Sequence, residues 1–325
     1  MNIVLASDNN YAAHMATLIA SLCENNDKEK EIIIHILSND IDKTIQNKIF
    51  NLESYYVNLK IKFYDLTSQE IEKRIGVKIK HDRSISAYAR IFIPDILDEH
   101  INKALYLDVD GIVMESIKEL FEIDINDYYI AGVSDVVRLE KKIAVGLTKD
   151  DTYINSGMIM WNLIKCREDK VVEKFIKFIR EKNGDVLAMD QGTINGTVSS
   201  YIKVLDPNWN VLTPFFQLST SELISEYGMI SYYEDGKLKN AINRPKFVHF
   251  VPNHMNRPWK KGCSHPLKKE YWRYRNKTLF SITKLEKDDR KNKEKALGVL
   301  FRLLPYKLYN YIFQKYSCLR KVFKV

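Results

Sequence analysis

The first 66 residues alternate between short apolar runs and longer segments of helical periodicity, and this alternation restricts the fold more than any other feature. Apolar runs at 2–6, 31–37 and 59–66 have the length of strands. The second run is apolar at almost every position, as in a strand buried on both faces. Residues 11–23 and 42–55 have helical spacing. Strands that alternate with helices form parallel sheets, so we predict an α/β fold with a central, mostly parallel sheet flanked by helices.

The rest of the chain continues this alternation until its composition changes near residue 284. Helices are predicted at 68–75, 84–93 and 169–180, and strands at 103–107, 128–133, 153–161 and 247–250. The apolar stripe of the helix at 169–180 is interpreted as a face packed on the sheet. A highly charged run then precedes a basic, aromatic segment. We therefore predict a main domain at 1–283 and a tail at 284–325.

The net charge of +8, from 50 Lys and Arg against 42 Asp and Glu, is concentrated in the tail. Residues 295–325 contain seven cations and no acid, which leaves 43 cations against 42 acids in residues 1–294. A nearly neutral main domain argues against a nucleic-acid-binding surface.

The cysteines and the apolar runs indicate a cytoplasmic protein. The four cysteines are far apart and form no C-x-x-C pair, so we expect reduced thiols. The chain has no apolar run of membrane-spanning length, and its first residues lack the basic start of a signal peptide.

Polar residues follow the first predicted strand, where a nucleotide-binding protein of this class has its ligand. Asp8 and Asn10 lie there, without a G-x-G-x-x-G fingerprint or a phosphate-binding P-loop. Their side chains suit a base or a ribose. The alternative is that they cap the following helix.

Two aspartates, Asp108 and Asp110, end the predicted strand at 103–107 and precede Gly111. In extended backbone, residues two apart point to the same side, so both carboxylates would face one spot while Val109 returns to the core. Close carboxylates repel unless a cation lies between them, and such a pair suits Mg²⁺ or Mn²⁺. The alternative is a solvated turn.

His249 lies inside the apolar strand predicted at 247–250. It is either a core histidine with satisfied hydrogen bonds or a third metal ligand. A nitrogen ligand beside two carboxylates favours Mn²⁺ over Mg²⁺.

Two further polar clusters interrupt apolar segments. Asn155, Ser156 and Gly157 lie within a predicted strand, where polar groups need partners or a ligand and glycine indicates close backbone approach or a bulge. Asp190 and Gln191 open a predicted short helix. Asp190 fits an N-cap, but beside a sugar the pair would supply hydrogen bonds and a partner for a cationic transition state.

Taken in order, these segments resemble glycosyltransferase family 8, and most closely its bacterial lipopolysaccharide α-galactosyl- and α-glucosyltransferases. The resemblance covers roughly residues 1–275. It is carried by ASDNNYAAH (6–14), SISAYARIFIPDIL (84–97), KALYLDVDGIV (103–113), YINSGMIMWNL (153–163), LAMDQGTIN (187–195) and HF…RPW (249–259).

The resemblance implies a GT-A type nucleotide-sugar fold and a catalytic domain at 1–283. It implies a Mn²⁺ ion, with Mg²⁺ as the alternative, that bridges the UDP diphosphate. The metal ligands would be Asp108, Asp110 and His249. The uridine contacts would be Asp8 and Asn10, and Ala6, Val109 and Arg257 would also line the nucleotide. The donor-sugar contacts would be Arg90, Asp108, Asn155, Ser156 and Asp190, with Asp135 near the sugar and the acceptor and Gln191 on the β-face.

The function implied is a retaining hexosyltransferase that moves galactose or glucose from a UDP-sugar to a surface-glycan or lipopolysaccharide acceptor. Because Gln191 is an amide and a poor nucleophile, front-face attack by the acceptor is favoured, with Asp190 as a transient nucleophile the minor option. Two alternatives from other classes are a metal-dependent nucleotidyl or phosphoryl transferase and an inactive peripheral lipid-binding module.

One segment departs from the family pattern. Where the family has glycine three residues after the metal histidine, this chain has Pro252, and the family's lysine is replaced by Arg257. The loop at 250–257 is about two residues longer. Pro252 has no N–H for the diphosphate, whereas Arg257 can clamp a phosphate, with Lys260 and Lys261 as backup cations.

The tail interleaves seven aromatic residues with its cations, and Pro305 divides it into two short helical pieces. This pattern predicts an amphipathic anchor on the anionic inner face of the cell membrane. The alternatives are a C-terminal helix packed on the core and a nucleic-acid patch.

Overall fold

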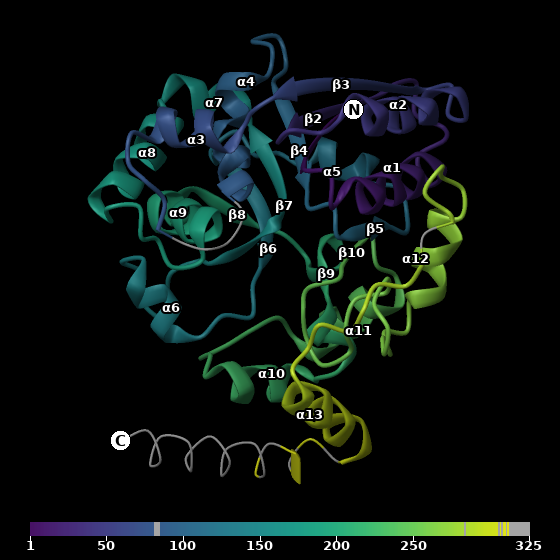
Figure 1. Ribbon diagram of the computed structural model, residues 1–325. Coiled ribbons are helices and arrows are strands. Elements are labelled where there is room, and N and C mark those ends of the chain that lie inside the picture. The colour runs from purple at the N-terminus through teal and green to yellow at the C-terminus, as the bar shows by residue number, and fades with distance from the viewer. Residues whose placement is uncertain (81–84, 283, 305, 307, 310, 312–325) are drawn as a thin grey trace.

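The computed structural model describes residues 1–80, 85–282, 284–304, 306, 308, 309 and 311. Its centre is a seven-stranded sheet of order β3-β2-β1-β4-β7-β6-β8 (Figure 1). The strands are β1 Asn2–Ser7, β2 Ile32–Ser38, β3 Leu59–Asp65, β4 Lys103–Leu107, β6 Ile130–Ser134, β7 Ile154–Asn162 and β8 Ile202–Val204.

Most neighbouring strands of this sheet are parallel, as predicted. β1 pairs in parallel with β2 and β4, β2 with β3, and β6 with β8, whereas β7 is antiparallel to both β4 and β6. The chain moves outward from β1 to β3 and then returns to the other side of β1 with β4. Ligands of open α/β sheets bind at such a reversal, outside the carboxyl ends of the strands.

Both faces of the sheet are covered because its strands are apolar on both sides. In β4, Ala104 and Tyr106 enter one buried cluster while Leu105 and Leu107 enter the other. The helices of the first cluster are α3 Ser68–Ile75, η2 Ile85–Phe92, α4 Ile93–Ile96, α7 Leu163–Glu168, α8 Val171–Glu181 and α9 Met189–Val198. Those of the second are α1 Ala12–Asn25, α2 Lys43–Phe50, η1 Asn51–Ser54, α5 Lys118–Glu122 and η4 Pro207–Trp209.

A second sheet of three strands, β5-β10-β9, extends the fold below the main sheet (Figure 1). Its strands are β5 Gly111–Val113, β9 Val211–Leu212 and β10 Phe247–His249. A third apolar cluster joins it to η5 Thr213–Phe216, α10 Thr220–Tyr227, α11 Asp235–Asn243 and α12 Lys268–Arg275. The remaining short helices are α6 Leu139–Ala144 and η3 Ser199–Tyr201.

The predicted elements differ from the structure mainly at their ends. The segment at 42–55 is split into α2 and η1, and the described part of 84–93 is the 3₁₀ helix η2 followed by α4, with Ser84 outside the described residues. The helix predicted at 169–180 begins at Val171, after α7.

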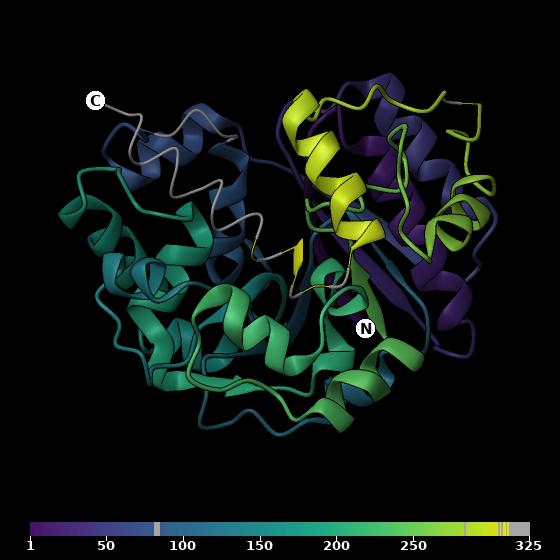
Figure 2. The ribbon, with the colours of Figure 1, turned by 90° about the horizontal axis from the view of Figure 1, so that it is seen from below.

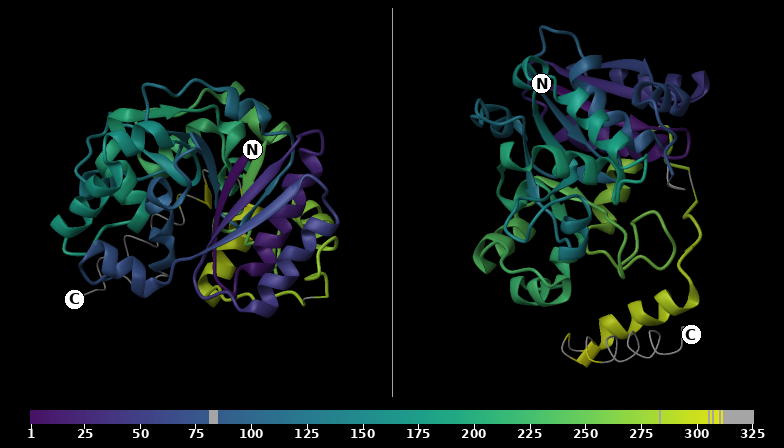
Figure 3. Two further views of the ribbon diagram at one scale, coloured as in Figure 1. Left: turned by 90° about the horizontal axis from the view of Figure 1, so that it is seen from above. Right: turned by 90° about the vertical axis from the view of Figure 1, so that its left-hand side faces the viewer.

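The described part of the tail packs against the domain. Helix α13, Asn292–Leu303, lies at the end of the molecule away from β3 (Figures 1 and 3), and it is nearest the viewer when the molecule is seen from below (Figure 2). Phe301 stacks on His254, with ring centroids 5.1 Å apart. The Tyr309 hydroxyl lies 3.0 Å from Nε2 of the same histidine, and Tyr306 donates to Glu226 at 3.0 Å. Pro305 and residues 312–325 lie outside the described residues.

Among the described residues, no helix combines the length and the apolar character that crossing a membrane requires.

Candidate active site

The link between the two sheets places both aspartates beside His249. Strand β4 ends at Leu107, and β5 begins at Gly111 and pairs with β10 so that Gly111 lies opposite His249. A side chain at Gly111 would collide with the Phe247 ring, so the short link requires glycine there. The two carboxylates between the strands therefore converge on the imidazole.

The three predicted metal ligands form a cluster in which one donor atom from each lies within 4.8 Å of the others. Nε2 of His249 lies 2.9 Å from Oδ1 of Asp110 and 3.7 Å from Oδ2 of Asp108. Two atoms bound at right angles, about 2.1 Å from one ion, lie about 3 Å apart, so this spacing fits a divalent cation. Oxygen ligands with one imidazole suit Mn²⁺ or Mg²⁺.

Each carboxylate presents one oxygen to the cluster because its other oxygen already has partners. Oδ1 of Asp108 accepts hydrogen bonds from Arg90 and from the Tyr106 hydroxyl, each at 2.8 Å. Oδ2 of Asp110 accepts one from Arg257 at 2.7 Å. The second oxygens are thereby oriented before any ion binds.

Burial and charge act in opposite directions on this cluster. Burial would raise the pKa of Asp110, but the charges of His249 and Arg257 outweigh it and hold that pKa well below its usual range. Burial would lower the pKa of His249, but Asp110 and Asp108 outweigh it and raise that pKa. The two carboxylates therefore favour the protonated form of the imidazole, and a bound metal would have to displace that proton.

Asn155 fixes the orientation of the His249 ring by contacting Nδ1, the ring nitrogen that faces away from the carboxylates. Oδ1 of Asn155 lies 3.2 Å from Nδ1 of His249 and also accepts hydrogen bonds from the Gly157 N–H and from Asn210 Nδ2, both at 3.0 Å. Because this oxygen only accepts, Nδ1 carries a proton and Nε2 faces the carboxylates. A side chain at Gly157 would collide with the imidazole, which explains the glycine in this strand.

Asn155, Ser156 and Gly157 reach the site because β7 runs antiparallel to β4. Leu107 lies opposite Met158, and the Asp108 N–H donates to the Gly157 carbonyl at 2.7 Å. The start of β7 is therefore beside the end of β4. A parallel β7 would have carried these polar residues to the opposite edge of the sheet.

Arg90 connects the metal cluster to Asp190. Its guanidinium donates to Asp108 at 2.8 Å and to the Ser156 carbonyl at 2.7 Å, lies 3.1 Å from Oδ2 of Asp190, and covers the Tyr106 ring at 4.3 Å. Burial would lower the pKa of Arg90, but the two aspartates raise it, so it stays cationic. Because these groups occupy its nitrogens, Arg90 holds two acidic side chains at a fixed spacing.

Asp190 is the second residue of α9, and the N-cap position is Ala188, so the alternative that Asp190 is the N-cap is wrong. Burial raises the pKa of Asp190, although the charge of Arg90 opposes this. Oδ2 of Asp190 also accepts the Ser156 hydroxyl at 2.9 Å.

The Gln191 amide is held at both ends. Its oxygen accepts the Ser156 N–H at 3.1 Å, and its nitrogen donates to Oδ2 of Asp135 at 2.8 Å and lies 3.5 Å from the Tyr153 hydroxyl. Burial raises the pKa of Asp135, and the Gln191 hydrogen bond opposes this. Asp135 therefore lies at the end of a row of contacts that begins at Asp108.

Asp8 and Asn10 lie after β1, beside the end of β4. Oδ1 of Asp8 accepts the N–H groups of Asn10 at 2.9 Å and Tyr11 at 3.1 Å, which closes the turn into α1. The N-cap position of α1 is Tyr11, so Asp8 caps the turn that leads into this helix and not the helix itself. Asn10 is exposed, Ala6 is half-buried, and Val109 is buried in the second apolar cluster.

Arg257 lies against Asp110 through the long loop after β10. Besides its contact with Asp110, it donates to the Tyr11 hydroxyl at 2.9 Å and to the Phe250 carbonyl at 3.2 Å. A guanidinium thus lies beside the cluster despite the substitution of Pro252. Lys260, expected as a backup cation, instead forms an ion pair with Asp289.

Three further residues of the site were not predicted from the sequence: Tyr106, Tyr153 and Asn210. Tyr106 had a signal, because it precedes Asp108 by two residues and so points the same way along the strand. The sequence carries no signal for Asn210. It is a fully buried loop residue, and the residue that it contacts, Asn155, is 55 positions away in the sequence.

Comparisons with known proteins identify the family of the chain. The family described as Glycosyl transferase family 8 matches residues 2–263. General stress protein A of Bacillus subtilis (strain 168) is 30% identical over 284 residues, which are 86% of this chain and 95% of that protein. The lipopolysaccharide 1,2-glucosyltransferase of Escherichia coli is 27% identical over 216 residues, which are 65% of this chain and 62% of that protein.

Among solved structures, galactosyltransferase LgtC in complex with donor and acceptor sugar analogs has a TM-score of 0.69 at 22% identity, covering 86% of this chain and 96% of that one. This likeness shows a shared fold and confirms the predicted GT-A type arrangement.

Proposed function

Because the chain belongs to glycosyltransferase family 8, we propose that it transfers galactose or glucose from a UDP-sugar to a surface-glycan or lipopolysaccharide acceptor, with retention of configuration. The observation that carries this proposal is the unbroken row of contacts from the Asp108–Asp110–His249 cluster to Gln191 and Asp135. Two of its relatives are named as a lipopolysaccharide glucosyltransferase and a galactosyltransferase, which supports the choice of hexose and acceptor.

The metal proposed is Mn²⁺, held by Asp108, Asp110 and His249, with Mg²⁺ as the alternative. When bound, it would neutralise the charge that develops on the departing diphosphate. Arg257, whose guanidinium lies beside Asp110, would hold a phosphate oxygen through a charge-assisted hydrogen bond. Asp8 and Asn10 would contact the uridine, and Ala6 and Val109 would line the nucleotide.

The donor sugar would lie over Ser156, Asp190 and Gln191. Breakage of the bond between the anomeric carbon and the phosphate oxygen leaves positive charge on the sugar, as in glycoside hydrolysis. The Asp190 carboxylate would stabilise that charge, and its ion pair with Arg90 keeps it in place.

Retention is proposed to follow from attack on the front face. The amide of Gln191 is fixed by Ser156 and Asp135 and is a poor nucleophile, so the acceptor hydroxyl would attack from the side that the diphosphate leaves. The new bond joins the acceptor oxygen to the anomeric carbon, and the departing phosphate oxygen takes the acceptor proton. A transient bond to Asp190 is the minor alternative.

The test is product release from a panel of UDP-sugars with Mn²⁺, with and without EDTA. We expect UDP from UDP-galactose or UDP-glucose, and none after EDTA. Pyrophosphate as the product would indicate a nucleotidyl transferase instead, and absence of turnover with every donor would indicate the inactive lipid-binding alternative.

Exchanging Gln191 for alanine should leave measurable transfer, because front-face attack forms no bond to this residue. The loss should be about 10- to 100-fold, since the amide also orients Asp135 and Ser156. The measurement is the initial rate of UDP release and the anomeric configuration of the product by NMR. Complete loss in Q191A, with Mn²⁺ affinity intact, would argue for covalent participation of this residue.

The tail is proposed to attach the enzyme peripherally to the inner face of the cell membrane. Each of its cations near an anionic surface contributes roughly 1 kcal/mol of binding free energy. Phe301, Tyr306 and Tyr309 pack on the domain, so this role falls to Leu308, which is exposed, and to the cations of residues 312–325.

A chain ending at Tyr311 retains the described packing and loses four cations, Lys315, Arg320, Lys321 and Lys324. Full-length protein should sediment with vesicles of phosphatidylglycerol, whereas the shortened chain should remain in the supernatant. Both should release UDP at the same rate from a water-soluble acceptor. Equal sedimentation of the two chains would remove the anchor from the proposal.

A further inference from the structure

The first part of the tail is bonded to the loop that carries Arg257. Residues 284–291 form a strap that leads into α13 (Figure 1). The Glu286 N–H donates to the Trp259 carbonyl, and the Glu286 carbonyl accepts the Lys261 N–H, each at 2.9 Å. These two hydrogen bonds join the strap to the loop just after Arg257, as neighbouring parallel strands are joined.

The strap also contacts the loop on the other side of Arg257. Nδ2 of Asn256 donates to Oδ1 of Asp288 at 3.3 Å, and Nη1 of Arg290 donates to the His254 carbonyl at 2.7 Å. Asp288 and Arg290 are paired with each other at 2.8 Å, so both contacts come from one ion pair. The strap therefore holds the loop both before and after Arg257.

Aromatic side chains connect the strap to the Arg257 guanidinium as well. Oε1 of Glu286 lies 3.3 Å from Nε2 of His14, and the centre of the His14 ring lies 4.1 Å from that of Trp259. The guanidinium lies 5.4 Å from the centre of the Trp259 ring and donates to the Tyr11 hydroxyl. The rings of Tyr11 and His14 meet edge to face. His14, which the strap contacts, therefore packs against two partners of the guanidinium.

The loop needs such support because it has little regular structure of its own. The described residues 250–267, between β10 and α12, form no helix or strand. Such a segment keeps conformational freedom unless other parts of the protein hold it. A ligand that has to order a loop loses affinity to the entropy of ordering, and a loop ordered in advance removes that cost. Because the strap holds the loop, Arg257 lies beside Asp110 before any phosphate binds.

We propose that the strap is a positioning element of the donor site: it holds Arg257 beside the metal cluster, where a nucleoside diphosphate would bind, and so sets the affinity for that ligand. The inference rests on the proposed transfer from a UDP-sugar, and it adds residues 284–291 to the site of that transfer. The cations at 312–325, proposed for membrane attachment, are not required for this role. The tail thus divides into a part that serves the donor site and a part that serves attachment.

The test compares Glu286→Pro with Glu286→Ala in the full-length protein. Proline removes the carboxylate and also the N–H that donates to Trp259, whereas alanine removes the carboxylate alone and is the matched control. Asp288→Ala removes the contact with Asn256, before Arg257. UDP affinity is measured by isothermal titration calorimetry at saturating Mn²⁺, and hydrogen exchange is followed at the amides of the loop.

We expect the Kd for UDP to rise about fivefold or more in E286P and D288A, because binding must then order the loop. In E286A the rise should be less than about threefold, since both backbone hydrogen bonds remain. The loop amides should exchange about tenfold faster or more in E286P. A Kd within about twofold of wild type in both E286P and D288A, or unchanged exchange of the loop, would overturn the proposal.

Arg257→Ala separates positioning of the guanidinium from general support of the fold. In the R257A background, E286P should weaken UDP binding by less than about twofold, because the contact that the strap supports is already absent. Additive losses, of about fivefold from E286P with or without Arg257, would show that the strap stabilises the loop without acting through this residue. That result would also overturn the proposal.

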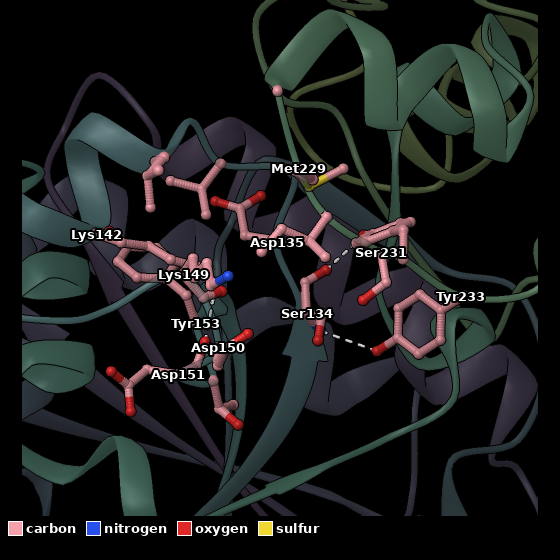
Figure 4. Close-up of a pocket in the computed structure, with 16 residues that line it drawn as sticks. Ser134, Asp135, Lys142, Lys149, Asp150, Asp151, Tyr153, Met229, Ser231 and Tyr233 are labelled. Carbon is pink, nitrogen blue, oxygen red and sulfur yellow. Dashed lines mark hydrogen bonds between the residues drawn. The ribbon is translucent and has the colours of Figure 1, made fainter.

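The kinetic constants supply a further readout. Asp135 and Tyr153, at the other end of the row of contacts from the metal cluster, line a cavity whose described lining residues lie within 134–153 and 228–233 (Figure 4). The strap lies outside both ranges, so this end of the site should be unaffected. E286P should therefore raise the donor KM while kcat at saturating UDP-sugar changes less than about twofold. A lower kcat at an unchanged donor KM would contradict the positioning role.

The wild-type protein distinguishes failure of this inference from failure of the proposed function. If it binds UDP with Mn²⁺ and releases UDP from a UDP-sugar, the strap variants decide the inference alone. If it neither binds UDP with Mn²⁺ nor releases UDP from any UDP-sugar, the proposed function is overturned and this inference with it.

Discussion

Exchange of Asp110 for asparagine should reduce UDP-sugar turnover by more than about 100-fold, since loss of a proposed metal ligand should exceed the 10- to 100-fold typical of a ligand's supporting partner. Asp110 faces His249 with one oxygen and Arg257 with the other, at 2.9 and 2.7 Å. Asparagine preserves the shape but removes the charge. The variant would leave two buried cationic groups without their counter-charge, and a divalent cation would add to that repulsion.

The measurement is UDP release across a Mn²⁺ titration, with Mn²⁺ affinity followed independently by electron paramagnetic resonance. The matched control is Asp206→Asn, which breaks the ion pair with Lys237 on an exposed surface and should leave turnover and affinity unchanged. Circular dichroism of both variants separates loss of the ion from loss of the fold. Wild-type Mn²⁺ affinity in D110N would show that Asp110 is no ligand.

The position of this cluster is predictable from the sequence because its signal is local. An apolar run that ends in Asp-x-Asp places both carboxylates on one side of extended backbone, and the run at 103–107 coincides with β4. His249 carries a weaker signal, a histidine in an apolar strand. That it meets Asp110 depends on the pairing of β10 with β5, which joins residues more than 130 positions apart.

The direction of β7 is not predictable in this way. A strand buried along its whole length has the same pattern whichever way it runs, and periodicity cannot distinguish parallel from antiparallel pairing. Yet the direction decides which end of β7 reaches the site. The sequence indicates that Asn155 and Ser156 need partners, and only the antiparallel pairing with β4 identifies those partners.

The structure of the tail is not predictable from its composition, because a basic, aromatic composition fits both a packed helix and a surface anchor. Tyr309 and Tyr311 are two residues apart in the same basic, aromatic stretch, but Tyr309 is buried and hydrogen-bonded to His254 while Tyr311 is 57% exposed. The partner of Tyr309 is 55 positions away. Packing of the tail on the domain, one of the alternatives from the sequence, is therefore correct for Phe301, Tyr306 and Tyr309.

Exchange of Asn155 for leucine should weaken Mn²⁺ binding by about 10- to 100-fold, because the residue orients His249, a proposed metal ligand. The family resemblance implies that Asn155 contacts the donor sugar, but its oxygen is shared among His249, Gly157 and Asn210. Leucine leaves Nδ1 of the imidazole without an acceptor, so the ring can rotate or change tautomer. Aspartate keeps an acceptor at that position, so Asn155→Asp should retain Mn²⁺ affinity far better than Asn155→Leu.

Asn210→Ala provides the matched variant, because Asn210 is fully buried and supports the Asn155 oxygen from the side away from solvent. If Asn155 acts through His249, N155L and N210A should both weaken Mn²⁺ binding, with the donor KM at saturating Mn²⁺ changed much less. A direct contact with the sugar predicts the reverse: N155L and N155D would both raise the donor KM, N210A would have little effect, and Mn²⁺ affinity would stay at the wild-type value throughout. The Mn²⁺ titration therefore distinguishes the two roles of Asn155. A residue that positions the His249 imidazole affects Mn²⁺ affinity without contacting the ion, whereas a residue that contacts only the sugar leaves that affinity unchanged.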